Sequence, residues 1–101
     1  MKTESDIESR LVRRVEHFGG KCIKFTSPSE DGIPDRVVVL PKGRIAFVEL
    51  KRPRGGRIAA LQTYQIKKLR NLGCLARVVK TFAEIEELLS DMLGEDYEER
   101  G

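Results

Sequence analysis

One predicted β-hairpin constrains the fold more than any other part of the chain. Two stretches rich in Val, Ile and Phe, residues 36–40 and 44–50, flank the short connection Pro41-Lys42-Gly43. β-Branched and aromatic residues favour strands, and a three-residue connection between two strands favours an antiparallel hairpin. Facing residues in this hairpin have numbers that sum to 84, which puts Asp35 opposite Glu49.

The chain before the hairpin predicts one helix and one strand. Ser5 followed three residues later by Glu8 forms a capping box, and apolar residues recur at helical spacing from Ile7 to Phe18. We therefore expect a helix over residues 6–18. Two glycines end it, and the following residues 21–26 are predicted to form a strand.

The chain after the hairpin predicts helix, strand and helix. Apolar residues at helical spacing predict a second helix that ends at Gly73. Residues 75–79 are predicted to form a further short strand. Thr81 and Glu84 cap a last amphipathic helix. The inner faces of these two helices are expected to carry Ile58, Leu61, Ile66, Leu69 and Leu72, then Phe82, Ile85, Leu88, Leu89 and Met92. The fold class is α/β, with a small mixed sheet centred on the hairpin and flanked by about three helices.

Size and composition limit the class of protein. With 101 residues the chain has room for one core, so we expect one domain, residues 1–93, followed by an acidic flexible tail, residues 94–101. No apolar run approaches the ~20 residues of a transmembrane helix, and the polar start is unlike a secretory signal. We expect a cytoplasmic protein with no membrane partner. Cys22 and Cys74 lack the spacing of a zinc site and are expected to be reduced, packed thiols.

The net charge of +3 hides an uneven distribution. Residues 1–80 contain 18 Lys or Arg and 8 Asp or Glu, a net +10, whereas residues 81–101 contain one Arg and 8 acids, a net −7. A basic body favours a polyanionic partner such as nucleic acid. Arg52, Arg54 and Arg57, in the breaker-rich loop after the hairpin, are candidates for contacts with phosphate groups.

The hairpin brings together residues that favour metal-assisted chemistry. Directly opposed side chains have Cβ atoms about 5 Å apart, where two carboxylates repel each other unless a cation neutralises them. Lys51 follows Glu49 by two residues and so shares its face of the strand. Helical periodicity also turns Glu8 and Gln62 inward, and buried polar groups of this kind need partners such as a hydrated metal ion.

These residues resemble a known pattern. Gly32-Ile33-Pro34-Asp35, followed after an interval by Glu49-Leu50-Lys51, is similar to the PD-(D/E)XK nuclease signature. GIPDR, FVELK, the basic Gly-rich loop and the Gln-bearing helix more narrowly resemble the VRR-NUC branch, the virus-type replication-repair nuclease domain, over roughly residues 5–80. The resemblance implies a restriction-endonuclease-like core and a short, phage-type member that acts in a bacterial host.

The resemblance also implies a ligand set and a substrate. Asp35, Glu49 and the carbonyl of Leu50 would bind Mg²⁺ or Mn²⁺, Lys51 would assist the attacking water, and Glu8 and Gln62 would complete the site, Glu8 acting on the metal indirectly. Lys24 occupies the place of a basic residue often found ahead of the motif, and Arg36 is expected to contact DNA with it. Similar proteins form dimers that cut branched DNA such as four-way junctions.

The predicted activity is therefore metal-dependent cleavage of DNA phosphodiester bonds, structure-specific, in replication, recombination or repair. A homodimer is expected because a core of this size is small and a two-fold pair presents two cleavage sites to a symmetric branched substrate.

Other interpretations of the same residues stay open. Glu8 is either the capping partner of Ser5 or a site residue, and Lys51 is either catalytic or an edge charge that blocks strand aggregation. For the whole chain, the alternative to a nuclease is a non-catalytic nucleic-acid-binding module or targeting subunit with a degenerate nuclease fold. A protein-interaction module that uses the acidic last helix is a third possibility.

Overall fold

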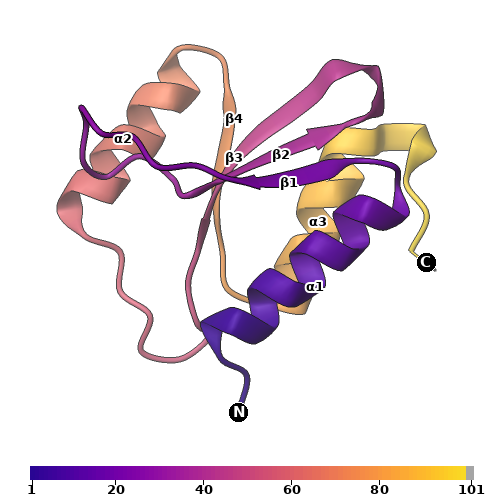
Figure 1. Ribbon diagram of the computed structural model, residues 1–101, viewed down its shortest axis with the longest axis horizontal. Coiled ribbons are helices and arrows are strands. Elements are labelled where there is room, and N and C mark those ends of the chain that lie inside the picture. The colour runs from indigo at the N-terminus through magenta and orange to yellow at the C-terminus, as the bar shows by residue number, and fades with distance from the viewer. Residues whose placement is uncertain (100–101) are drawn as a thin grey trace.

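The centre of the molecule is a four-stranded mixed sheet in the order β1-β2-β3-β4 (Figure 1). The computed structural model describes residues 1–99. Strands β1 (Lys21–Lys24), β2 (Arg36–Leu40) and β3 (Arg44–Leu50) pair antiparallel, and β4 (Leu75–Val79) pairs with β3 in parallel. Such a sheet needs a crossover between β3 and β4, which helix α2 (Ala60–Asn71) provides.

The β2–β3 hairpin has the register that the sequence predicts. Arg36 pairs with Val48 and Leu40 with Arg44, so facing residues sum to 84 throughout. The connection is a single 3₁₀ turn, Pro41–Gly43, in which Lys42 and Gly43 have φ values of 69° and 72°. Glycine adopts this left-handed conformation without steric cost. The conformation allows the chain to reverse direction within three residues.

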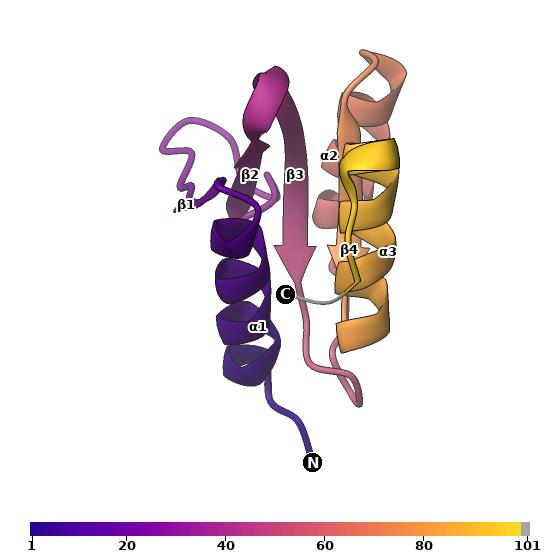
Figure 2. The ribbon, with the colours of Figure 1, turned by 90° about the vertical axis from the view of Figure 1, so that its right-hand side faces the viewer.

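Two helices cover one face of the sheet and one helix packs at the other. Helices α1 (Glu4–His17) and α3 (Phe82–Leu93) lie side by side on the same face, whereas α2 packs beside β4 (Figures 1 and 2). The predicted α/β class with three helices around a mixed sheet is confirmed. The core between the sheet and the α1–α3 layer consists of Ile7, Leu11, Val15, Val38, Leu40, Ala46, Val48, Leu50, Val79, Ile85, Leu88, Leu89, Met92 and Leu93.

The start of α1 differs from the prediction. Thr3, and not Ser5, is the N-cap: its hydroxyl accepts from the Asp6 backbone N–H, and the Asp6 carboxylate accepts from the Thr3 N–H. Both Thr3–Asp6 and Ser5–Glu8 have the spacing of a capping box, and the upstream pair begins the helix two residues earlier. The capping role of Glu8 is therefore excluded, and its side chain is available for a tertiary contact.

Helix α2 also differs from its predicted inner face. Leu61 and Leu72 are 45% and 73% exposed, and the buried residues of the helix are Gln65 and Ile66. The side-chain amide of Gln65 donates to the backbone carbonyl of Asp31 at 3.3 Å. This contact and the one made by Gln62 lie on the inner side of the helix. Helical periodicity also turned Gln62 inward, and the structure agrees, whereas the inward placement of Leu61 and Leu72 is wrong.

The two cysteines are free thiols within the described part of the chain, and both are half-buried. Burial raises the pKa of Cys22 to about 11, with the Asp35 charge acting in the same direction. Cys22 is therefore protonated at neutral pH, as a packed thiol is expected to be.

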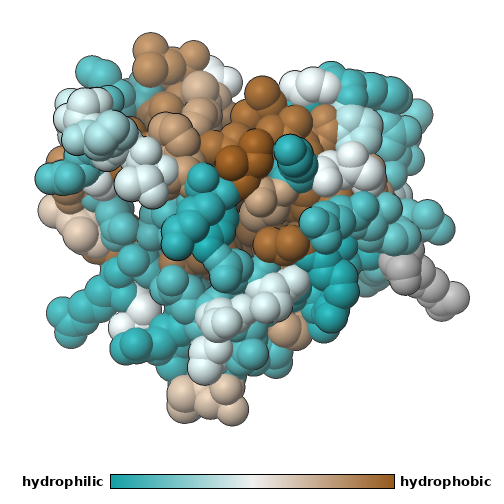
Figure 3. Space-filling view, in the orientation of Figure 1, coloured by the Kyte–Doolittle hydropathy of each residue, from teal (hydrophilic) through white to brown (hydrophobic). Residues whose placement is uncertain are grey.

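The sheet face opposite α1 and α3 is only partly covered. The register aligns Ile23, Val37 and Phe47 across three strands and Val39 beside Ile45. Ile23 and Ile45 are exposed, and the other three are half-buried. Figure 3 shows this apolar surface gathered over the sheet, between α2 and the hairpin tip.

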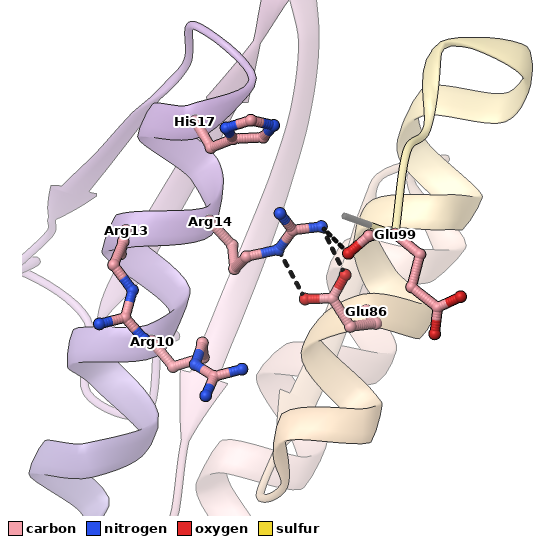
Figure 4. Close-up of a pocket in the computed structure, with 6 residues that line it drawn as sticks. All are labelled: Arg10, Arg13, Arg14, His17, Glu86 and Glu99. Atoms are coloured by element: carbon pink, nitrogen blue, oxygen red, sulfur yellow. Dashed lines mark hydrogen bonds and ion pairs between the residues drawn. The ribbon is translucent and has the colours of Figure 1, made fainter. Parts of the chain in front are cut away.

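Ion pairs hold the C-terminal segment against α1 and the hairpin. The Arg14 guanidinium binds Glu86 through two hydrogen bonds of 2.9 Å and also donates to the backbone carbonyls of Glu98 and Glu99 (Figure 4). At the hairpin tip, Asp96 accepts from Lys42 and Arg44. Within the predicted tail, Asp96, Glu98 and Glu99 thus make these contacts, and residues 100–101 lie outside the described part. Within residues 1–99, no helix has the length and apolar character to cross a membrane.

We expect Arg14→Leu to lower the free energy of unfolding by about 2 to 3 kcal/mol, because Glu86 and two carbonyls lose a charged donor. Arg13→Leu, on the exposed side of the same helix, is the matched control and should change stability by less than about 0.5 kcal/mol. Urea unfolding followed by circular dichroism measures both. Equal effects of the two substitutions would contradict this role for Arg14.

Candidate active site

Two carboxylates face each other where β2 begins and β3 ends. Continuing the β2–β3 register by one residue puts Asp35 opposite Glu49. Glu49 is only 4% exposed, and one oxygen of Asp35, Oδ1, is buried without a hydrogen-bond partner. Burying a carboxylate oxygen without a hydrogen-bond donor costs folding free energy. A cation bound between these two groups would compensate for that cost.

The electrostatic environment of this pair disfavours two negative charges. Burial raises the pKa of Asp35, and the charge of Glu4 adds to that increase. Burial also raises the pKa of Glu49, with the Asp35 charge as the next cause, while Lys51 acts in the opposite direction. Mutual repulsion across the hairpin thus adds to desolvation, and a cation bound between the carboxylates would oppose both effects.

Lys51 and Gln62 lie against Glu49, as the sequence predicts for neighbours of the site. The Lys51 ammonium is 3.4 Å from Glu49 Oε2, and the Gln62 amide donates to the same oxygen at 3.0 Å. Gln62 Oε1 accepts from the backbone N–H of Ala59 at 3.0 Å. The side chain therefore caps the start of α2 and also orients Glu49. The sequence predicted that Gln62 points toward the site, but neither of these two partners.

Glu8 and Arg36 occupy positions that sequence reasoning did not foresee. Glu8 forms an ion pair with Arg36, which points toward the α1 side of the sheet because it pairs with core residue Val48. Arg36 is 8% exposed, donates to the Asp35 carbonyl at 3.0 Å and lies 3.6 Å from Asp35 Oδ2. The structure thus brings Asp35, Glu49, Lys51 and Gln62 together directly and connects Glu8 to them through Arg36.

The donor set fits a hard divalent cation. Asp35 and Glu49 offer carboxylate oxygens, and Leu50 is the next residue along β3. Among residues 1–99, no group of three or more His, Cys, Asp and Glu side chains is close enough to hold a metal ion. Mg²⁺ commonly takes one or two protein carboxylates and retains several waters, so a pair with one partnerless buried oxygen satisfies its requirement.

An open groove of about 710 Å³ runs past Lys51 and Gln62. Its other lining residues are Asp31, Gly32, Arg57, Ile58, Ala59 and Leu61. The arginines that were predicted to contact phosphate therefore lie in different places. Arg57 lines the groove itself, whereas the Arg52 guanidinium donates to the carbonyls of Arg54 and Gly55 in its own loop.

The remaining predicted DNA contacts lie outside the groove. Arg54 is exposed on the same loop and lines a hollow with Met1 and Phe82. Lys24 is exposed at the end of β1, opposite Arg36 in the register. Lys80 donates to the carbonyl of Gly56 at 3.2 Å and ties the basic loop to the chain that follows β4.

Gly32 determines how the loop that carries Asp35 meets α2. Its φ is +82°, and a Cβ built at this position would lie 2.8 Å from the carbonyl oxygen and Cγ of Leu61. Together with the bond from Gln65 to Asp31, this close approach docks the GIPD segment on the helix. The sequence shows the glycine in the motif, but its contact with Leu61 depends on the tertiary fold.

This chain is similar in structure to a solved protein domain and similar in sequence to a phage protein. A solved structure described as a VRR_NUC domain matches with a TM-score of 0.80 and 28% identity over 88% of this chain and 97% of that chain. A protein of Acyrthosiphon pisum secondary endosymbiont phage 1, described as "Putative nuclease p44", is 52% identical over 50 residues. That alignment covers 50% of this chain and 54% of the phage protein, so the chain matches about half the length of this curated relative. No family model matches the chain.

The predicted resemblance to VRR-NUC domains is confirmed by these two matches. The fold class is confirmed with it, because the mixed four-stranded sheet and three helices are shared with a VRR_NUC domain over most of both chains.

Gly32→Ala should disturb the site more than a glycine substitution elsewhere. Gly43 also has a positive φ, +72°, but has nothing within 4 Å of a built Cβ, so Gly43→Ala serves as the matched control. We expect Gly43→Ala to cost about 1 kcal/mol of stability from backbone strain, and Gly32→Ala about 2 to 3 kcal/mol because the backbone must also move away from Leu61. Urea unfolding measures both, and equal costs would refute the docking role of Gly32.

Proposed function

We propose that this chain, which shares its fold with a VRR_NUC domain and resembles a phage nuclease over half its length, is a metal-dependent endodeoxyribonuclease. The observation that carries the proposal is the buried, partnerless oxygen of Asp35 opposite Glu49, with Lys51 beside it in a groove lined by Arg57. A structural hairpin gains nothing from two opposed carboxylates, whereas hydrolysis of a phosphodiester requires a cation at such a place.

The residues divide the work of hydrolysis. Asp35, Glu49 and the Leu50 carbonyl would hold Mg²⁺ or Mn²⁺, which when bound lowers the pKa of water and stabilises negative charge on the phosphoryl oxygens. The Lys51 ammonium, 3.4 Å from Glu49, assists the attacking water and attracts a phosphate oxygen. Gln62 keeps Glu49 oriented, and Arg57 binds a phosphate along the groove.

Glu8 has an indirect role in this proposal. Its carboxylate neutralises Arg36, and Arg36 in turn holds the backbone at Asp35. Arg36 is thereby assigned to positioning rather than to a phosphate contact, because its guanidinium is already engaged by Glu8 and Asp35. Lys24, Arg52 and Arg54 remain candidates for more distant phosphates, since all three are exposed.

We further propose branched DNA, such as a four-way junction, as the substrate in replication, recombination or repair, acted on in the cytoplasm of a bacterial host. The similarity to a phage protein described as a nuclease supports the setting. Phosphate contacts from Lys51 and Arg57 read charge and not base identity, which suits recognition by shape rather than by sequence.

Lys51→Ala should abolish cleavage. The unaltered protein is incubated with labelled four-way junction, flap, linear and single-stranded DNA. We expect it to cut at least one of these DNAs with Mg²⁺ or Mn²⁺ and none of them in EDTA. The substitution should lower the cleavage rate by at least about a hundredfold, because the attacking water loses its assisting group. Lys68→Ala, on the exposed surface of α2, is the control and should retain activity.

Binding measurements separate this nuclease from the alternative function. Calorimetry should show Mn²⁺ binding that Asp35→Asn removes and Lys68→Ala retains. Tight DNA binding without cleavage by either metal, together with unchanged Mn²⁺ binding in Asp35→Asn, would replace the nuclease with a non-catalytic nucleic-acid-binding module.

A homodimer completes the proposal. The partly covered sheet face that carries Ile23, Val37, Val39, Ile45 and Phe47 offers an apolar surface, and a second copy on a two-fold axis would bury it. We expect light scattering after size exclusion to give about twice the 11.5 kDa of one chain, and Ile45→Lys to give one chain. Lys67→Glu, a charge change on exposed α2, is the control. A single-chain mass for the unaltered protein over a broad concentration range would disprove the dimer.

A further inference from the structure

The groove beside the carboxylate pair has walls of two different kinds. Lys51 and Arg57 supply two positive charges against the one negative charge of Asp31, and Gln62 supplies an amide. Ile58, Ala59 and Leu61 supply an apolar wall in the same groove. Phosphates need only the charged wall, because an apolar surface offers them no interaction.

Leu61 is both exposed and held in place. Its side chain is 45% exposed, although its backbone and Cγ are in close contact with Gly32. Tyr64 follows by three residues on α2, hence on a neighbouring part of the same helix surface, and is 56% exposed. A fixed apolar side chain at the edge of a basic groove, with an aromatic ring one turn along, offers contact area to a flat, weakly polar group.

We propose that Ile58 and Leu61 form a subsite for one unpaired nucleobase, next to a phosphate held by Lys51 and Arg57. This inference rests on the proposed nuclease function and names a feature of its substrate. Nucleobases present apolar faces that pack against aromatic and aliphatic side chains, and such contacts tolerate any base identity. In a paired duplex those faces are stacked inside the helix and do not reach a protein groove.

The subsite selects DNA that is already distorted. A base at a branch point, bulge or single-stranded end reaches the apolar wall without the cost of unstacking, which amounts to a few kcal/mol in intact duplex. Cleavage next to an unpaired nucleotide is therefore faster than cleavage of the same sequence when fully paired, and Leu61 is responsible for part of the difference.

The test compares two labelled duplexes of identical sequence, one fully paired and one with a single bulged nucleotide at a fixed position. We expect the unaltered protein with Mg²⁺ or Mn²⁺ to cut beside the bulge at least about tenfold faster than at the same place in the paired duplex. Leu61→Ala should reduce that ratio about fivefold or more, whereas Leu72→Ala, an exposed leucine at the other end of α2, should leave it unchanged. Leu61→Met, which keeps an apolar side chain, should restore most of it.

A second measurement does not depend on cleavage. With 2-aminopurine as the bulged base and EDTA present, binding of the unaltered protein should change its fluorescence, and Leu61→Ala should remove the change while Leu72→Ala retains it. Circular dichroism confirms that both variants are folded. If neither duplex nor any branched DNA is cut, the nuclease proposal fails while this measurement still tests the subsite. An unchanged cleavage ratio or an unchanged fluorescence response in folded Leu61→Ala overturns the subsite.

Discussion

The pairing of β2 with β3 is the constraint on which the rest of the site depends. Because facing residues sum to 84, the register that buries Val38, Ala46 and Val48 against α1 and α3 also puts Asp35 opposite Glu49. A slip of one residue would turn the core residues outward and separate the carboxylates in the same step. Core packing and site geometry therefore depend on the same strand register. Because the core fixes that register, the two carboxylates stay opposite each other despite their repulsion.

Helix α2 adapts the surroundings of the pair to this constraint. It contributes two glutamines on its inner side, one that bonds Glu49 and one that bonds the carbonyl of Asp31. An inner face of leucines would pack more apolar surface but would leave these polar groups without donors. The helix consequently leaves Leu61 and Leu72 exposed, and Leu61 becomes part of the groove wall.

Two networks of charged residues lie in different parts of the molecule. Around the proposed site, Lys51 and Arg57 face the groove, and Arg36 lies between Glu8 and Asp35. At the α1–α3 side, Arg14 engages Glu86 and the backbone of residues 98–99, and Asp96 engages the hairpin tip. This second network uses acidic residues of the C-terminal part as structural partners of basic ones, so the negative charge of that part is bound away from the groove.

The local sequence pattern by itself determined the central hairpin of this protein and most of the residues around the carboxylate pair. Enrichment in Val, Ile and Phe identified β2 and β3 to the residue, and the turn length fixed their register. The positions of Asp35, Glu49 and Lys51 followed from that register, and the inward position of Gln62 followed from helical periodicity. Tertiary structure alone decided the pairing of Glu8 with Arg36, the docking of Gly32 on Leu61 and the bond between Arg14 and Glu86, 72 residues apart. Periodicity shows which way a side chain points from its own helix or strand. The partner that it contacts depends on how separate elements pack, and that packing is determined by all the core residues together.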